Sequence, residues 1–132
     1  MKNYNIGNRE IKFRFWDAEE KEMQESMDIA SDDSVYLDQF FNMEEFIPMQ
    51  FTGIKDNNGV SVFEGDIVVV YDADGDSKQH VVYWGGNSDY PAFELDPLYT
   101  DACNNLQHAI SEIGYSLEVI GNIFENPELL KK

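Results

Sequence analysis

Three aspartates at alternate positions, Asp72, Asp74 and Asp76, form the segment whose residue types could most readily bind a metal. Carboxylates with this spacing begin an EF-hand calcium loop, in which the sixth residue is glycine and the twelfth is a bidentate glutamate. Here those positions hold Ser77 and Tyr83, and the flanking residues have the pattern of strands. Because a β-turn also favours aspartate and glycine, we expect a polar turn without a metal.

Residues suited to nucleophilic or acid–base catalysis are few and far apart. His80 and His108 are the two histidines, and neither has a cysteine, a second histidine or paired carboxylates at a usable spacing. Cys103 lies on the apolar face of a predicted helix, which favours a small core side chain over a nucleophile. As the single cysteine, it also excludes an internal disulfide. We predict that the protein is not an enzyme and binds no cofactor.

A small concentration of positive charge lies in the segment Arg9–Asp17, whose alternating apolar and polar residues predict a half-buried strand. Small barrels often bind nucleic acid through basic and aromatic side chains on a strand. The residues of this kind are Arg9, Lys12, Arg14 and Trp16, and the last three alternate onto one face. They form a candidate nucleic-acid surface. We favour a second interpretation, in which they are solvated charges at a sheet edge that oppose aggregation between strands.

The net charge of −17 weighs against nucleic acid and anionic lipid as direct partners, because it creates a potential that repels phosphate groups. The first residues lack the apolar core of a signal peptide, and no run approaches the ~18 apolar residues of a membrane span. We therefore expect a soluble cytoplasmic protein. A sharper alternative is a protein that presents carboxylates to a basic partner, or that imitates a phosphate backbone.

The central stretch Met49–Tyr71 predicts a β-sheet core. Asn58-Gly59 lies between two apolar runs and predicts a hairpin with a type I′ turn, in which both central residues have positive φ. Gly65, between Glu64 and Asp66, predicts a sharp corner of the kind that small closed barrels require. Further strands are expected around residues 9–17, 23–29, 66–71, 78–84, 92–95 and 116–124. The spacing of the apolar residues near 36–41 predicts a short helix lying on the barrel, with an irregular strand as the alternative.

Helical periodicity predicts one amphipathic helix over residues 100–113, packed on the sheet. Gly121 inside the last strand predicts a bulge or a close crossing by another strand, and Asn126-Pro127 predicts the start of a final helical turn. With 132 residues and 42% hydrophobic content, we expect one domain, comprising a strand-rich segment over about residues 9–45 and a barrel over about residues 46–132.

Three blocks of the chain together resemble the YopX family of bacteriophage and prophage proteins. They are REIKFRFWD at Arg9–Asp17, MQFTGIKDNNGVSVFEGDIVVV at Met49–Val70 and EVIGNIFENPELL at Glu118–Leu130. Phe15 departs from the family pattern, which usually has a small residue there, and residues 60–62 replace a more charged stretch. The signature positions are Trp16, Asp17, Gly53, Asn58, Gly59, Glu64, Gly65, Asp66, Gly121, Asn122, Asn126 and Pro127, and each has a structural explanation in a turn, a strand or a helix start.

The resemblance implies a mainly β fold, with an SH3-like small β-barrel, extra N-terminal strands and one packed α-helix near the C-terminus. It also implies a phage or prophage origin, action in the bacterial cytoplasm and no catalytic residues. SH3-like barrels offer a groove between loops, here near Asp72–Ser77 and Gly85–Tyr90, whose aspartates would favour a basic protein partner. We therefore predict an accessory protein-binding module. A nucleic-acid-binding barrel and an acidic DNA mimic that inhibits a host protein remain the alternatives.

Overall fold

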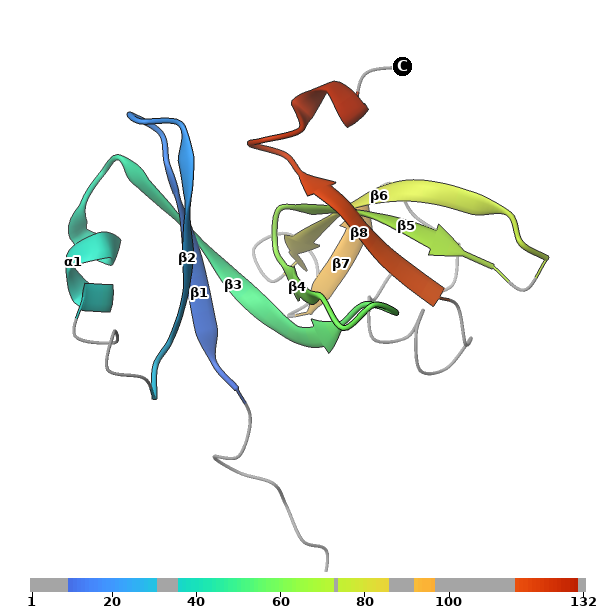
Figure 1. Ribbon diagram of the computed structural model, residues 1–132, viewed down its shortest axis with the longest axis horizontal. Coiled ribbons are helices and arrows are strands. Elements are labelled where there is room, and N and C mark those ends of the chain that lie inside the picture. Colours follow the sequence, from blue (N-terminus) through green and yellow to red (C-terminus); the bar gives the residue numbers. More distant parts are fainter. Residues whose placement is uncertain (1–9, 31–35, 73, 86–91, 97–115, 131–132) are drawn as a thin grey trace, which may run out of the picture. The chain divides into compact units, whose positions relative to one another are not determined.

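The computed structural model describes residues 10–30, 36–72, 74–85, 92–96 and 116–130. Within these residues the chain is mainly β, as predicted, with two four-stranded antiparallel sheets (Figure 1). The elements are β1 (Lys12–Asp17), β2 (Glu22–Asp28), α1 (Leu37–Asn42), β3 (Phe46–Lys55), β4 (Ser61–Phe63), β5 (Asp66–Tyr71), β6 (Ser77–Trp84), β7 (Phe93–Asp96), β8 (Ser116–Asn122) and the 3-10 turn η4 (Pro127–Leu130). The chain divides into two compact units, Met1–Gly53 and Ile54–Lys132.

In the first unit β1 lies between β2 and β3, and the complete sheet has the order β2-β1-β3-β4. The interpretation of Lys12 and Arg14 as edge charges is therefore wrong, because β1 is hydrogen-bonded on both sides. β3 is ten residues long, and its first half, from Phe46 to Gln50, pairs with β1. This pairing is why the first unit continues to Gly53, later than the boundary predicted near residue 45.

One face of the first sheet carries a cluster of phenylalanine rings. Phe15, on β1, is fully buried, and its ring centroid lies 5.1 Å from that of Phe40 and 5.2 Å from that of Phe41, both on α1. Phe46 on β3 stacks edge-on against Phe40 at 4.6 Å. The short helix predicted near residues 36–41 is thus confirmed. This helix packs on the first sheet and not on the predicted barrel, because the rings of Phe40 and Phe41 pack against Phe15.

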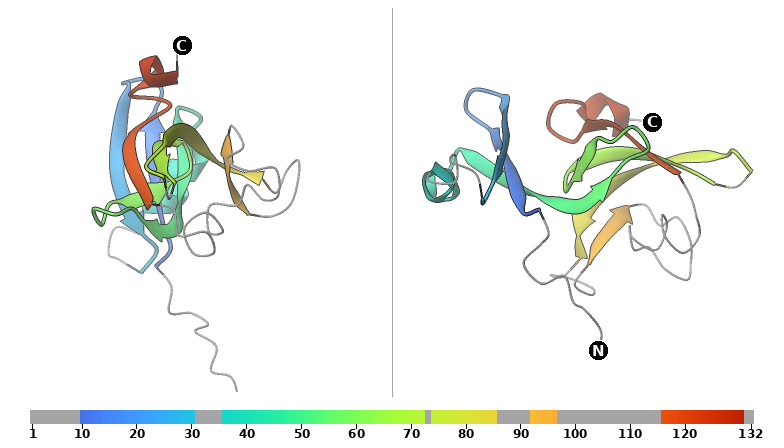
Figure 2. Two further views of the ribbon diagram at one scale, coloured as in Figure 1. Left: turned by 90° about the vertical axis from the view of Figure 1, so that its right-hand side faces the viewer. Right: turned by 60° about the horizontal axis from the view of Figure 1, so that its bottom comes forward.

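The sheet of the second unit has the order β7-β6-β5-β8, visible from two further directions in Figure 2. Its core consists of aliphatic side chains from five strands: Val62, Val68, Val70, Val82, Leu95 and Leu117. β5, β6, β7 and β8 confirm the predicted strands to within two residues at each end. The predicted helix over residues 100–113 lies outside the described residues.

The hairpin between β3 and β4 exists, but its turn differs from the predicted type I′. Among the described residues only Lys21 combines a side chain with positive φ, so Asn58 has negative φ. Gly59 has φ +81°, and its N–H donates to the Asp56 carbonyl at 3.0 Å. This is a three-residue loop that ends in a glycine bulge. The aspartate before the loop stabilises it, as described below.

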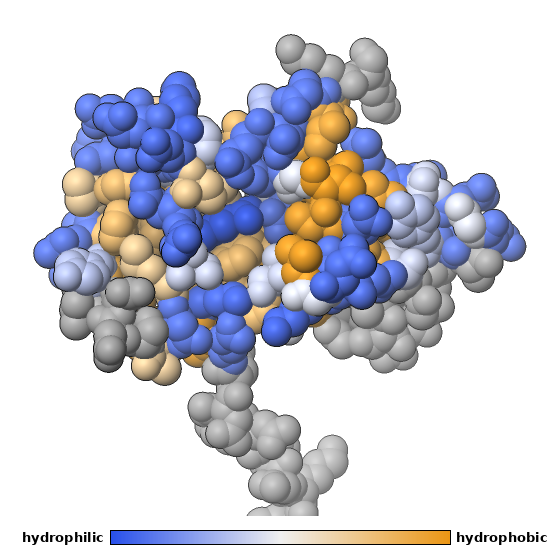
Figure 3. Space-filling model, in the orientation of Figure 1, coloured by the Kyte–Doolittle hydropathy of each residue, from blue (hydrophilic) through white to orange (hydrophobic). Residues whose placement is uncertain are grey.

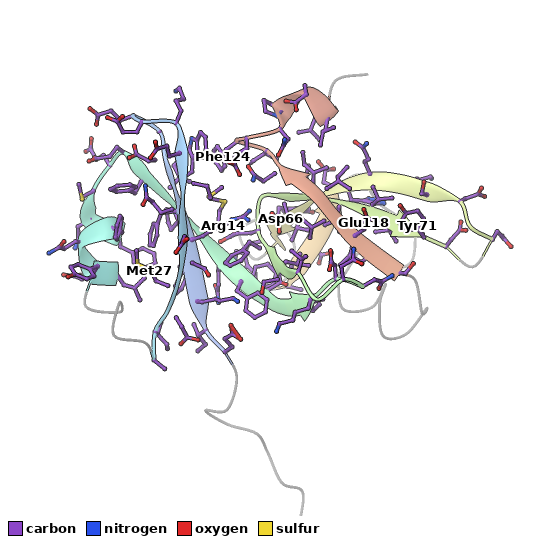
Figure 4. The ribbon with its side chains drawn as sticks, viewed as in Figure 1. Arg14, Met27, Asp66, Tyr71, Glu118 and Phe124 are labelled. Carbon is purple, nitrogen blue, oxygen red and sulfur yellow. The ribbon has the colours of Figure 1, made fainter. Side chains whose placement is uncertain are left out.

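The corner between β4 and β5 is as sharp as predicted. Gly65 has φ +87°, a backbone angle that residues with a side chain rarely adopt. Its N–H donates to the Val82 carbonyl at 2.7 Å, and its own carbonyl accepts from the Ile123 N–H at 2.9 Å. The buried Asp66 carboxylate accepts from the Phe63 N–H at 2.7 Å and closes the turn (Figure 4). The corner therefore joins three parts of the second sheet.

Candidate functional site

The predicted partner-binding loop is the turn between β5 and β6, and a single carboxylate organises it. Asp72 Oδ1 accepts hydrogen bonds from the N–H groups of Asp74, at 2.9 Å, and Asp76, at 3.0 Å. The Asp72 N–H donates to the Asp76 carbonyl at 2.9 Å, and Gly75, with φ +85°, donates its N–H to the Asp72 carbonyl. Asp72 is therefore a structural residue of this turn, and its Oδ1 is already occupied.

The other two aspartates of the loop are exposed. Asp74 and Asp76 lie at the tip of the β5–β6 hairpin, which extends beyond the other strands of its sheet in Figures 1 and 2. The predicted opposite wall of the groove, residues 85–90, is described only at Gly85. Within the described ranges, no three His, Cys, Asp or Glu residues come close enough to hold a metal ion. The loop therefore presents two solvent-exposed carboxylates, those of Asp74 and Asp76, on a turn that the Asp72 carboxylate holds by hydrogen bonds.

The candidate nucleic-acid surface on β1 is largely engaged or buried. The Lys12 ammonium lies 2.8 Å from the Glu10 carboxylate and 4.6 Å from the ring centre of Phe51. Trp16 is only 7% exposed, which leaves little indole surface for a base to stack on. Arg14 is half-buried, and its side chain lies on the other face of the first sheet from that of Met27 on β2 (Figure 4). Arg9 lies outside the described residues. The three of these residues that the structure describes, Lys12, Arg14 and Trp16, do not form an open basic surface.

Asp17, a signature position, holds the turn between β1 and β2. Its Oδ1 accepts from the N–H groups of Glu19, at 3.0 Å, and Glu20, at 2.9 Å, and its carbonyl accepts from the Lys21 N–H at 2.7 Å. The same arrangement of an aspartate before a turn thus occurs at Asp17 and Asp72. At both positions the carboxylate accepts hydrogen bonds from backbone N–H groups of its turn, which is a structural role.

Asp56 accepts three hydrogen bonds from backbone N–H groups, and the sequence pattern did not single it out. It is 7% exposed, and its Oδ1 accepts from the N–H groups of Asn58 and Val60 at 2.8 and 2.9 Å. Its Oδ2 accepts from the Val119 N–H on β8 at 2.9 Å, and the Asn57 N–H donates to the Leu117 carbonyl. Asp56 therefore ties the hairpin loop to a strand 63 positions away.

These hydrogen bonds lower the pKa of Asp56. Burial disfavours the carboxylate and raises its pKa, but the backbone donors of Val119, Val60 and Asn58 outweigh burial, so the pKa lies below its ordinary value of 3.8. The backbone N–H groups therefore stabilise the ionised form of the Asp56 carboxylate. An aspartate at the start of Asp-Asn-Asn-Gly is a local signal for such a turn, but nothing local points to Val119.

The C-terminal signature residues, from Gly121-Asn122 to Asn126-Pro127, form a second turn that side chains hold by hydrogen bonds to the backbone. Asn122 Oδ1 accepts from the N–H groups of Phe124 and Glu125, and Asn126 Oδ1 accepts from the Asn122 N–H at 3.2 Å. The register of β5 against β8 shifts beside Gly121, which confirms the predicted bulge. The close approach is made by the Asn126 side chain and not by another strand. Pro127 then begins η4, the final helical turn predicted at Asn126-Pro127.

Gly121→Ala is expected to destabilise the second unit by about 1–3 kcal/mol, as tight overpacking does. A Cβ at this position would lie 2.6 Å from Asn126 Oδ1 and 2.9 Å from Asn126 Cβ, so the whole side chain must move and release the Asn122 N–H. Chemical denaturation measures the change. Gly121→Ala combined with Asn126→Gly removes the clash and should cost less than Gly121→Ala alone. A single variant as stable as the parent would contradict the packing described here.

No helix within the described ranges is long and apolar enough to cross a membrane. No curated protein matches this chain. The chain is similar to protein EF1440 from Enterococcus faecalis, with 33% sequence identity, a TM-score of 0.56, and coverage of 92% of this chain and 98% of that one. It is also similar in fold to the yopX protein of Bacillus subtilis, at 18% identity, a TM-score of 0.55 and coverage of 91% and 98%.

The family model described as "YopX protein" matches residues 12–131. This range includes the strands of both sheets and the turns held by Asp56 and Asn122, so the match covers the whole fold and not a single motif. The chain belongs to the YopX family.

Proposed function

We propose that this protein is a non-catalytic, phage- or prophage-derived accessory protein that binds a basic protein in the bacterial cytoplasm. The observation that carries the proposal is the tip of the β5–β6 hairpin, where exposed Asp74 and Asp76 stand on a turn held by Asp72. The second sheet would be the core of an SH3-like barrel, a fold that binds partners through the loops between its strands.

An acidic tip held by hydrogen bonds suits an arginine- or lysine-rich partner for two reasons. The turn is already ordered by hydrogen bonds, so binding does not have to fix it. The net charge of −17 also attracts a cationic partner over a long range and raises the rate of encounter. Neither feature helps a protein to bind nucleic acid, which the same field repels.

Two alternatives make different predictions. A nucleic-acid-binding barrel would use Arg9, Lys12, Arg14 and Trp16, but Lys12 is paired with Glu10 and Trp16 is buried. An acidic DNA mimic would capture a host protein whose natural ligand is DNA, and DNA would then compete for it. We place both below the general protein-binding module.

The test is capture of partners from a bacterial host lysate on the immobilised protein at low and at high salt, followed by calorimetry with each purified partner. We expect a salt-sensitive basic protein. Its affinity should fall by about 3- to 30-fold in Asp74→Asn/Asp76→Asn, because each exposed ion pair contributes about 0.3–1 kcal/mol. Asp72 is left unchanged, since its carboxylate holds the turn.

The matched control is Glu19→Gln/Glu20→Gln, which removes the same charge from the tip of the β1–β2 hairpin. This control should bind as the parent does. Gel shifts with DNA and RNA form the second arm. A shifted band that weakens on Arg14→Ala, with no protein captured, would favour the nucleic-acid alternative. Competition by DNA for a captured protein would favour the mimic.

A further inference from the structure

The hairpin loops after β3 and after β5, residues 56–60 and 72–76, have the same hydrogen bonds at equivalent positions. In each loop the N–H of the first residue, an aspartate, donates to the carbonyl of the fifth, at 2.8 and 2.9 Å. The N–H of the fourth residue, a glycine, donates to the aspartate carbonyl at 3.0 and 3.1 Å. The aspartate Oδ1 accepts from the N–H groups of the third and fifth residues at between 2.8 and 3.0 Å. The third residue is Asn58 in the first loop and Asp74 in the second, so this loop structure accepts either residue.

Asn58-Gly59 is the one asparagine–glycine pair in the sequence, and both residues are exposed to solvent. Figure 3 shows hydrophilic surface over this loop and over most of the matching tip of the β5–β6 hairpin, at the right. An asparagine side chain loses its amide most readily before glycine, because glycine has no side chain to hinder the approach of its backbone nitrogen. The pair is therefore the position in this chain where the amide is chemically most at risk.

Deamidation at this pair needs only water as a co-reactant. The Gly59 backbone nitrogen loses its proton and attacks Asn58 Cγ, so that a new N–C bond forms. The bond between Cγ and the amide nitrogen breaks, and that nitrogen takes up the proton and leaves as ammonia. The product is a cyclic succinimide. Water then opens the succinimide at either of its carbonyls, which gives aspartate or isoaspartate at residue 58.

The folded loop opposes the first step at the attacking nitrogen. The Gly59 N–H donates to the Asp56 carbonyl, so this hydrogen bond has to break before the nitrogen can attack. The Asp56 carboxylate fixes the backbone on both sides of Gly59, because it accepts from the N–H groups of Asn58 and Val60. A carboxylate charge at this position also disfavours a second negative charge on the Gly59 nitrogen. Asp56 is held in turn by the Val119 N–H on β8.

We propose that Asn58 is a site of spontaneous deamidation and that Asp56 sets its rate by holding the loop closed. The reaction then proceeds only from local openings of the loop. An aspartate product keeps the loop, as Asp74 does at the equivalent position. Isoaspartate carries the main chain through the side-chain carbons and lengthens the backbone before Gly59. The N–H groups of Gly59 and Val60 then no longer reach Asp56, and the attachment of the loop to β8 is weakened.

The test follows residue 58 in the full chain during incubation at a fixed, mildly alkaline pH. Peptide mass spectrometry measures the fraction of Asn58 that has lost its amide, and enzymatic methylation of isoaspartate separates the two products. The urea-unfolded parent gives the rate without protection. We expect the folded parent to react at least about tenfold more slowly, because a single hydrogen bond to a charged acceptor shifts an opening equilibrium by about this factor.

Asp56→Ala should remove most of this difference between folded and unfolded protein. Asp56→Asn, which keeps an acceptor, should react at an intermediate rate and keeps the test decisive if Asp56→Ala does not fold. The matched control is Asp72→Ala, which removes the equivalent carboxylate from the other loop of the same unit and should leave the rate at Asn58 unchanged. Equal rates in folded and unfolded parent, an Asp56→Asn rate equal to that of the parent, or equal acceleration by Asp72→Ala would each overturn the proposal.

Discussion

Asp56→Ala is expected to lower the free energy of unfolding of the second unit by about 2–4 kcal/mol, one of the largest effects of any single substitution in this chain. The substitution removes three hydrogen bonds from backbone N–H groups to a charged acceptor, at Asn58, Val60 and Val119. Charged hydrogen bonds contribute about 1.5–3 kcal/mol each, and a buried donor left without an acceptor costs about 1–3 kcal/mol. Chemical denaturation measures the change.

Asp56→Asn separates the charge from the hydrogen bonds. The amide oxygen still accepts from the loop, but the amide nitrogen faces the Val119 N–H, so we expect an intermediate loss. Because folding lowers the pKa of Asp56, its contribution to stability is complete above the ordinary value of 3.8 and is lost as pH falls through the lower folded value. The stability difference between the parent and Asp56→Asn should therefore shrink below pH 3.8. A difference that grows on acidification would contradict this assignment.

Phe15→Ala is expected to destabilise the first unit by about 3–5 kcal/mol, the usual cost of truncating a buried phenylalanine. Its ring has no exposed surface and contacts the rings of Phe40, Phe41 and Phe46. The small residue that the family usually has at this position would leave a cavity beneath α1 in this chain. Phe15→Leu should recover most of the loss, because it fills most of that volume.

The two tryptophans offer a readout for each unit, since Trp16 lies in the first and Trp84 in the second. On a Trp84→Phe background, fluorescence-detected denaturation follows the first unit alone. Phe15→Ala should shift that transition strongly. A loss below about 1 kcal/mol, the average for any substitution, would show that the ring cluster does not stabilise α1 against the sheet.

Local patterns in the sequence predicted most of the strands and the corner at Gly65. Alternation defined β1, a β-branched run defined β5, and Gly121 marked the bulge in β8. The errors arose where distant parts of the chain decide the outcome. Nothing in residues 9–17 shows that β1 is central, because its second neighbour, β3, begins at Phe46. The turn at Asn58-Gly59 took a different type because the Asp56 carboxylate accepts from the N–H groups of Asn58 and Val60, while the Gly59 N–H donates to the Asp56 carbonyl.

The candidate site was less predictable than the fold. Aspartates at Asp72, Asp74 and Asp76 looked equivalent in the sequence, but one organises the turn and the other two face solvent. Trp16 looked available for stacking because alternation says only which face a side chain is on, not whether that face is covered. The tie between Asp56 and Val119 joins residues 63 positions apart, which no local pattern encodes.

The salt dependence of partner binding tests the central claim, that the β5–β6 hairpin tip binds a basic protein. Affinity for the captured partner is measured by calorimetry over a series of salt concentrations, for the parent, Asp74→Asn/Asp76→Asn and Glu19→Gln/Glu20→Gln. We expect a steep loss of affinity with salt in the parent and the Glu19/Glu20 variant, and a weaker, less salt-dependent affinity in the Asp74/Asp76 variant. Equal affinities and equal salt dependence in all three proteins would contradict it.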